Sequence, residues 1–264
     1  MPSCEPELTP MLRPRTLYFI RHGEAYHNIL EKKAKMKARE GAIAEGLAPD
    51  SEETLRRMEE ARKGVLNDES LLDAPLSETG EKEAEDARRT LERLIKEEGL
   101  PPPTEVLVSP LERALQTANI IFPDHNNIHV REEVRERLTG KACDNAHSSA
   151  EIARRDSFKR FSMNRLLMKS LLRSLGSSKV GGFLKGELEN KYQLRERTLK
   201  LFDLIAESDH EVLAVVTHKG FLRELERGPF GNTDATEFAN CEVRVYRASF
   251  IVNVLDVENA ERVA

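Results

Sequence analysis

The chain has 264 residues, of which 39% are hydrophobic and 33% are charged, so it is long enough to bury a core and polar enough to stay in solution. Its formal net charge of −5 argues against non-specific nucleic-acid binding, which requires an excess of lysine and arginine. Charged residues interrupt every apolar run before it reaches the length of a membrane span. We therefore expect a globular protein that binds neither nucleic acid nor a membrane.

The first 14 residues are rich in proline and glutamate and lack the apolar core of a secretory signal. We interpret them as a disordered leader before one domain over residues 15–264. Cys4, Cys143 and Cys241 are odd in number and lack the spacing of a metal site. They favour a reducing, cytoplasmic location, and we expect no metal and no cofactor. Five scattered histidines are interpreted as ordinary surface or core residues: His27, His125, His129, His147 and His210.

The first half of the chain alternates between apolar strands and charged helices. Residues 16–20 are continuously apolar, as in a strand that is buried on both faces. Residues 28–63 have a helical pattern that breaks near residues 41–49. A loop at 74–80 precedes a helix over residues 81–98, whose apolar positions recur every three or four residues.

The same alternation continues in the second half. Buried strands are predicted at residues 105–108 and 211–217, with a weaker strand at 127–130 and a final, partly alternating strand at 243–253. Helices are predicted at residues 111–122 and 221–227. We expect Ser109 to cap the first of these helices, with Pro110 in its first turn.

Residues 141–191 interrupt this rhythm, and we expect them to form a helical insert over the site. Their apolar residues follow a helical stripe among many basic side chains: Phe158, Phe161, Met168, Leu172 and Leu175. Two main interpretations remain open, namely an amphipathic helix packed on the core and a basic lid over an anionic substrate, with binding to a membrane surface as a minor third. The Gly- and Ser-rich stretch 176–186 is predicted to be a mobile loop.

Strands that alternate with helices predict a three-layer α/β/α sandwich with a mostly parallel sheet. Ligands in such folds bind outside the carboxyl ends of the strands. Polar residues follow three of these ends: Arg21 and His22, Ser109 leading to Arg113, and His218. Because histidine can attack phosphorus and guanidinium groups bind phosphate oxygens, this grouping predicts a site for phosphate chemistry.

These residues fall in segments that resemble, in the same order, the motifs of the histidine phosphatase (phosphoglycerate mutase-like) superfamily. The segments are Arg21-His22-Gly23-Glu24 with Asn28, residues 109–118 around Arg113, residues 134–140 around Glu136, and residues 215–220 around His218. The loop at 75–80 is also similar to a loop of the family. Residues 141–144 and 238–246 look like segments of fungal and plant phosphoglycerate mutase-like proteins.

The resemblance implies a reaction through a phosphohistidine, and the chemistry of the residues agrees with it. His22 is the expected nucleophile, and it needs no metal because the cations come from the protein. Arg21 and Arg113 are expected to bind the equatorial phosphate oxygens, where charge accumulates in the transition state. His218 is a further catalytic donor to these oxygens, and Asn28 can offer its amide to phosphate or substrate.

Glu136 is the expected acid that protonates the leaving oxygen and then activates the hydrolytic water. Glu132 and Glu133 lie close by in the sequence, so a different glutamate remains an alternative. Lys219 follows His218 at a position where many relatives have a small residue, and the acid-phosphatase branch has an aspartate there. Without that aspartate, Glu136 must be the acid.

The sequence therefore predicts a metal-independent phosphatase that hydrolyses a small phosphorylated metabolite. Phosphoryl transfer of the phosphoglycerate mutase type is the alternative reaction, because it uses the same residues. A non-catalytic phosphate-binding protein is the alternative of a different class. No motif in the insert or in the helical stretch before Ala74 identifies the substrate.

Overall fold

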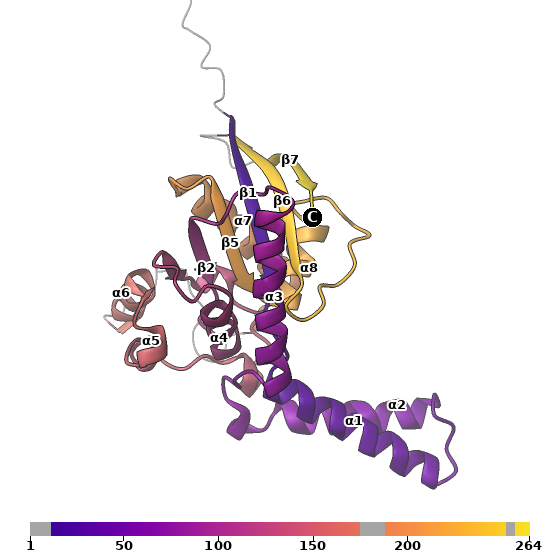
Figure 1. Ribbon diagram of the computed structural model, residues 1–264. Coiled ribbons are helices and arrows are strands. Elements are labelled where there is room, and N and C mark those ends of the chain that lie inside the picture. Colours follow the sequence, from indigo (N-terminus) through magenta and orange to yellow (C-terminus); the bar gives the residue numbers. More distant parts are fainter. Residues whose placement is uncertain (1–11, 175–187, 252–256) are drawn as a thin grey trace, which may run out of the picture.

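Figure 1 shows the computed structural model, which describes residues 12–174, 188–251 and 257–264. A seven-stranded sheet has the order β4-β3-β2-β5-β1-β6-β7. Its strands are β1 (Leu12–Arg21), β2 (Glu105–Val108), β3 (Ile128–Val130), β4 (Phe161–Ser162), β5 (Val212–Thr217), β6 (Val243–Ile251) and β7 (Val257–Arg262). The five strands from β4 to β1 are parallel, whereas β6 and β7 each pair antiparallel with the preceding strand in this order.

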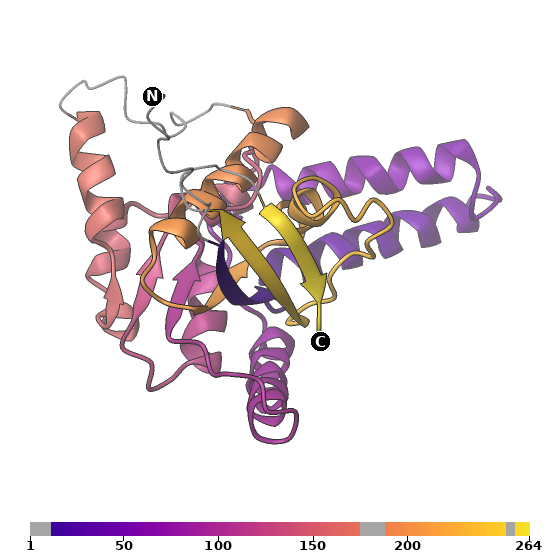
Figure 2. The ribbon, with the colours of Figure 1, turned by 90° about the horizontal axis from the view of Figure 1, so that it is seen from above.

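Helices cover both faces of the sheet, which confirms the predicted three-layer fold (Figures 1 and 2). They are α1 (Tyr26–Ala44), α2 (Glu52–Leu66), α3 (Glu78–Lys96), α4 (Glu112–Ile121), α5 (Ser149–Ala153), α6 (Asn164–Ser174), α7 (Lys191–Glu207) and α8 (Lys219–Arg227). Successive residues of a strand point to opposite faces. Tyr18 and Ile20 accordingly pack with α3 and α4, whereas Leu17 and Phe19 pack with α7 and α8.

Helices α1 and α2 form a hairpin that extends away from the sheet (Figures 1 and 2). Gly46 has a positive φ of 87° just after α1, which explains the predicted break in this helical stretch. Ser51 accepts a hydrogen bond from the Thr54 N–H and caps α2. An ion pair of 2.7 Å between Arg62 Nε and Glu31 Oε1 joins the two helices.

The predicted and observed elements differ at the two ends of the chain and after the insert. β1 begins at Leu12, so residues 12–14 of the expected leader pair with β6, while residues 1–11 lie outside the described part of the chain. β6 ends at Ile251, and the remainder of the predicted last strand is likewise not described. The sequence patterns predict neither α7 nor β7, which are both present.

The prediction of a single helix for the apolar stripe from Phe158 to Leu175 is wrong. Phe158 ends a 3-10 turn, Phe161 lies in β4, and α6 begins only at Asn164. Phe158, Phe161 and Leu166 are buried in the core on the α3–α4 side of the sheet, which favours the packed interpretation for this part of the insert. The loop predicted at 176–186 lies outside the described residues. No helix in the described ranges is both long and apolar enough to span a membrane.

Two glycines let the backbone after β1 cross the start of α3 at close range. A Cβ atom on Gly23 would lie 2.4 Å from the Gly80 carbonyl oxygen. A Cβ atom on Gly80 would lie 2.1 Å from the backbone carbonyl oxygen of Glu24. Glu24 also accepts a 2.8 Å hydrogen bond from the Ser77 N–H, and its carboxylate binds Lys32 and the Ser77 hydroxyl. Through these contacts, Glu24 holds the loop after β1 against the start of α3.

We predict that Gly80→Ala lowers the free energy of unfolding by about 1–3 kcal/mol, because the new methyl group overlaps backbone atoms that cannot move freely. Gly64→Ala is the matched control, since a methyl group added to Gly64 in α2 has no other atom within 4 Å and alanine favours a helix. Urea denaturation should show the control unchanged or more stable. Equal stability of wild type and Gly80→Ala would contradict the crossing.

Candidate active site

The carboxyl ends of β1, β2 and β5 meet at one edge of the sheet. Arg21 lies in register with Thr217, and the His22 N–H donates to the Thr217 carbonyl over 2.9 Å. β2 adjoins β5 on its other side, so Ser109 reaches the same edge. The ring centroids of His22 and His218 are 4.9 Å apart. The structure therefore brings together residues that are almost 200 positions apart in the sequence.

The imidazole of His22 is buried and has a defined arrangement of donor and acceptor. Its Nδ1 lies 2.6 Å from the Gly23 carbonyl, which can only accept, so Nδ1 carries the proton. Nε2 accepts a hydrogen bond of 3.3 Å from Arg113 Nε. Burial, and then the charges of Arg113 and Arg21, lower the pKa of His22 well below its usual value. His22 is thus neutral at pH 7, with an unprotonated Nε2.

Arg113, from α4, is 2% exposed and is held by three groups. Nε donates to His22, NH1 donates to the Cys143 carbonyl over 2.7 Å, and NH2 donates to Asp144 Oδ1 over 3.2 Å. A guanidinium group has five N–H donors, so two remain for another ligand. The contacts fix the direction of these donors beside the His22 ring.

Arg21 and Asn28 both line the same cavity as His22. Arg21 NH1 donates to the Phe238 carbonyl over 2.8 Å. The Asn28 side chain accepts from the Ala25 N–H over 3.1 Å and lies 3.0 Å from His27 Nε2. Asn28 therefore fixes the start of α1 in addition to lining the cavity.

His218 lies beside His22 but is fully buried and does not line the cavity. Its Nε2 makes a 2.7 Å hydrogen bond with the Ser109 hydroxyl, while Nδ1 has no partner among the described residues. The prediction that Ser109 caps the following helix is wrong. α4 begins at Glu112 with Leu111 as its N-cap residue, and the Ser109 hydroxyl binds His218 instead. Burial and then the charge of Arg113 lower the pKa of His218, so its ring is neutral.

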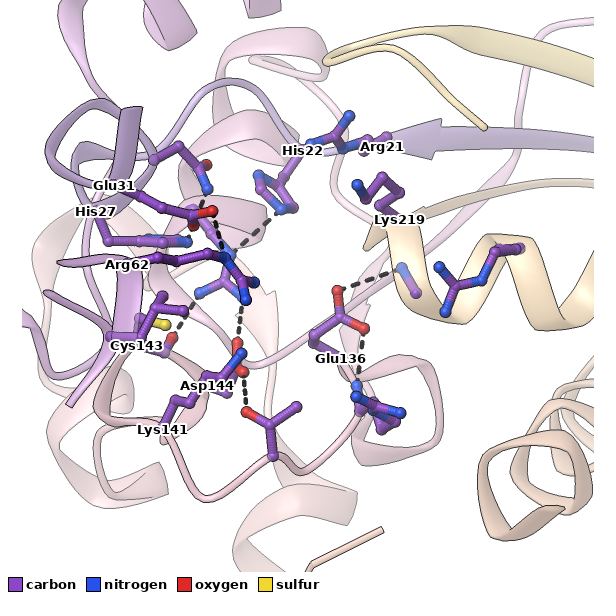
Figure 3. A pocket seen from close by; sticks show the side chains of 17 residues that line it. Arg21, His22, His27, Glu31, Arg62, Glu136, Lys141, Cys143, Asp144 and Lys219 are labelled. Atoms are coloured by element: carbon purple, nitrogen blue, oxygen red, sulfur yellow. Dashed lines mark hydrogen bonds and ion pairs between the residues drawn. The ribbon is translucent and has the colours of Figure 1, made fainter. Parts of the chain in front are cut away.

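Glu136 faces the cavity, and neither Glu132 nor Glu133 lines it. The Glu136 carboxylate accepts hydrogen bonds from the backbone N–H groups of Arg137 (2.8 Å) and Gly220 (3.3 Å). Burial, and then the charge of Asp144, raise the pKa of Glu136. Figure 3 shows this carboxyl group across the cavity from His22.

The loop that carries Glu136 is held in place by Arg197 of α7. Arg197 NH1 donates to the carbonyls of Glu133 (3.0 Å) and Arg135 (2.6 Å), and NH2 donates to that of Glu136 (3.2 Å). The guanidinium group also pairs with the buried Glu189 carboxylate. Because three carbonyls share one rigid cation, the position of Glu136 depends on a helix that the sequence patterns do not predict.

These residues surround a cavity of about 330 Å³ (Figure 3). Seven of its lining residues are cationic: Arg21, Arg62, Arg113, Arg137, Lys141, Lys219 and Arg223. Only three are carboxylates, namely Glu31, Glu136 and Asp144. The cavity is therefore electropositive although the chain as a whole is negative. Leu66 and the smaller Cys143 are the only apolar side chains among the described residues that line it.

The sequence reasoning missed several lining residues. Glu31 and Arg62 come from the α1–α2 hairpin, and no local motif marks either of them. His27 also lines the cavity, so its interpretation as an ordinary histidine is too simple. The only signal for Asp144 in the sequence is its place in the segment at 141–144. Among the described residues, no group of three His, Cys, Asp or Glu side chains could hold a metal ion.

Comparisons with known proteins agree with this arrangement. A family model of the histidine phosphatase superfamily (branch 1) matches residues 59–258. No curated protein matches the chain. Among solved structures, mycobacterial hydrolase 2 is 16% identical with a TM-score of 0.54, covering 96% of this chain and 90% of that chain. The native mycobacterial glucosyl-3-phosphoglycerate phosphatase is also 16% identical, with a TM-score of 0.52 and coverage of 96% and 98%.

A third solved structure is a putative α-ribazole-5′-phosphate phosphatase from Escherichia coli. It is 16% identical to this chain, with a TM-score of 0.51 and coverage of 94% of both chains. At these identities the likeness establishes the fold. The family match begins after Arg21 and His22, so their place in the site comes from the geometry described above.

We predict that His27 makes stability depend on pH. Burial, and then the charges of Arg113 and Lys141, lower its pKa to about 3, against about 6.5 in an unfolded chain. The unfolded state therefore binds an extra proton below pH 6.5. The stability that comes from the neutral ring is complete above pH 6.5, and each pH unit between about 6 and 3 removes about 1.4 kcal/mol.

The variant His27→Gln should lose this dependence. Urea denaturation at pH 7.5, 6.0 and 5.0 should show a shallower decline of the free energy of unfolding for the variant than for the wild type. Parallel declines in the two proteins would show that His27 becomes protonated in the folded state.

Proposed function

Because this chain belongs to the histidine phosphatase superfamily, we propose that it is a phosphatase that hydrolyses a small phosphomonoester through a phosphohistidine on His22. The observation that carries this proposal is the unprotonated Nε2 of a neutral His22, in contact with the guanidinium group of Arg113. The nucleophilic lone pair and the phosphate-binding cation are thus already adjacent.

In the first step, the lone pair of His22 Nε2 gives up the hydrogen bond from Arg113 Nε and forms a bond to phosphorus, while the bond from phosphorus to the ester oxygen breaks. Arg21 and the two free donors of Arg113 bind the equatorial oxygens, where negative charge accumulates. Glu136 donates its proton to the leaving oxygen, so that the alcohol leaves neutral. The raised pKa of Glu136 supports this role, because it keeps more of the carboxyl group protonated.

In the second step, water attacks the phosphohistidine. Glu136, now a carboxylate, accepts a proton from the water, while the bond from phosphorus to Nε2 breaks and its electrons return to the ring. The products are inorganic phosphate, neutral His22 and protonated Glu136. No metal takes part in this scheme, since the cations come from the chain.

His218 and Asn28 assist the phosphate group in this proposal. The Nδ1 atom of His218 has no partner among the described residues. Because it is buried beside the His22 ring and outside the cavity lining, we assign it to a phosphate oxygen only once the phosphoryl group is bonded to His22. The buried His218–Ser109 contact fixes its ring. Asn28 presents its amide at the hairpin side of the cavity.

The lining of the cavity supports a polar leaving group. Only Leu66 and Cys143 offer apolar side chains among the described lining residues, whereas charged groups of both signs come from the hairpin through Glu31 and Arg62. A small, hydroxylated or charged phosphorylated metabolite fits this lining better than an apolar ester. The buried thiols of Cys143 and Cys241 are unpaired, which suits a reducing compartment such as the cytoplasm.

We predict that His22→Ala lowers phosphate release at least about 10⁴-fold, because no other group supplies the nucleophile. Phosphate release should be measured over a panel of phosphorylated metabolites, with His210→Ala as the control histidine, since His210 binds Thr104 outside the cavity. Activity that survives in His22→Ala would remove His22 from the mechanism. Transfer of the phosphoryl group to a second hydroxyl without phosphate release would establish a mutase, and absence of both reactions in the wild type would indicate a binding protein.

If Glu136 is the acid, the effect of replacing it on kcat/KM should depend on the leaving group of the substrate. For an alkyl phosphate, kcat/KM of the wild type should fall as pH rises through the pKa of Glu136, because the deprotonated acid cannot assist the leaving alkoxide. Glu136→Gln should lower kcat/KM, which reports the first step, about 10²–10⁴-fold with that substrate. It should lower kcat/KM much less with p-nitrophenyl phosphate, whose leaving group needs no proton. Equal losses with both esters would assign the acid role elsewhere.

A further inference from the structure

Residues 238–242 lie directly behind the reacting groups and have no role in the proposed reaction. Arg21 NH1 donates to the Phe238 carbonyl over 2.8 Å, and the Arg21 N–H donates to the Glu242 carbonyl over 3.3 Å. The Cys241 N–H lies 3.5 Å from the His22 carbonyl. Arg21 Nε has no partner among the described residues, so Phe238 provides the hydrogen bond that fixes this guanidinium group.

This segment adopts a backbone that needs support. Cys241 has a φ of 54°, in the left-handed region that residues other than glycine rarely occupy. The Glu242 carboxylate closes the turn by accepting a 2.7 Å hydrogen bond from the Ala239 N–H. The turn is therefore held from within by one carboxylate, which is itself bound by Arg244.

Arg244, on β6, is the residue around which the segment folds. It is 2% exposed, and its guanidinium carbon lies 3.9 Å from the centre of the Phe238 ring. Its NH1 donates to both oxygens of the buried Glu226 (2.8 and 3.0 Å) and to the Thr236 carbonyl (2.9 Å). Its Nε donates to Glu242 over 2.6 Å.

We propose that Arg244 and Phe238 are positioning residues, which fix the guanidinium group of Arg21 in the direction of the bound phosphate. The line of contacts runs from the Arg244 cation to the face of the Phe238 ring, and from the Phe238 carbonyl to Arg21 NH1. The partners of Arg244 named above all lie outside the cavity lining, so Arg244 acts through Phe238. The catalytic consequence rests on the function proposed above, but the binding consequence does not.

The physical reason is the length of the arginine side chain. Arginine has many rotamers, and a guanidinium group that must be ordered on binding weakens that binding. The cation stacked on its ring locks Phe238, and the locked carbonyl selects one rotamer of Arg21 before phosphate arrives. Small displacements of such a group cost much of its benefit in the transition state.

The test replaces Phe238 by leucine, which keeps an apolar side chain but removes the ring face, and leaves the ion pairs of Arg244 in place. Phe161→Leu is the matched control. The guanidinium carbon of Arg160 lies 5.0 Å from the centre of the Phe161 ring, and neither residue lines the cavity. Both variants should lose similar stability in urea. Only Phe238→Leu should weaken the binding of inorganic phosphate, measured by calorimetry, and lower kcat/KM for p-nitrophenyl phosphate, each by about tenfold.

A double variant separates positioning from general damage. In the background of Arg21→Met, the further change Phe238→Leu should have almost no effect on phosphate binding, because its target is already gone. A full tenfold loss in that background, or equal losses in the Phe161 control, would overturn the proposal. If Phe238→Leu does not unfold cooperatively, Phe238→Met takes its place.

Phosphate binding also separates this proposal from the proposed function. A wild type that binds phosphate but hydrolyses no ester would refute the phosphatase, and the positioning role would still be decided by the binding series. A wild type that binds no phosphate at millimolar concentration would overturn the positioning role itself.

Discussion

The contact between Arg113 Nε and His22 Nε2 is the interaction on which the rest of the site depends. It places a permanent cation against the ring of the proposed nucleophile, and together with burial it keeps that ring neutral. The contact is possible because the parallel sheet brings the ends of β1 and β2 to the two sides of β5. A cation buried to this degree needs partners, and the Cys143 carbonyl and Asp144 supply them.

Three groups at the cavity, Arg113, Glu136 and Arg21, are each supported by a buried ion pair. Asp144 orients Arg113, the Arg197–Glu189 pair holds the loop of Glu136, and Arg244 packs on the residue that binds Arg21. These pairs lie where solvent cannot screen them, so they fix geometry more firmly than surface pairs do. These contacts define the positions of Arg113, Glu136 and Arg21 without a bound substrate, which suits the proposed reaction because it relies on placement and charge.

The α1–α2 hairpin gives the cavity its individual character. The strand ends of the sheet carry the residues to which we assign the phosphate chemistry, whereas Glu31, Arg62 and Leu66 line the cavity from the hairpin. Their mixture of charges leaves little apolar surface. We therefore expect this hairpin, which projects from the body of the protein (Figure 2), to contribute to the substrate specificity of the proposed reaction.

The sequence alone determined the fold class and four of the segments that form the site, because buried strands, helical periodicity and polar strand ends are local signals. Arg21, His22 and Arg113, which follow strand ends, all line the cavity, and so do Asn28 and Glu136, which only the family resemblance marked. The sequence could not show that His218 would turn to Ser109, that Arg62 would enter the cavity, or that Phe238 would hold Arg21 across 217 positions. Those contacts join residues that are distant along the chain, and only the packing of helices and loops around the sheet decides which of them meet.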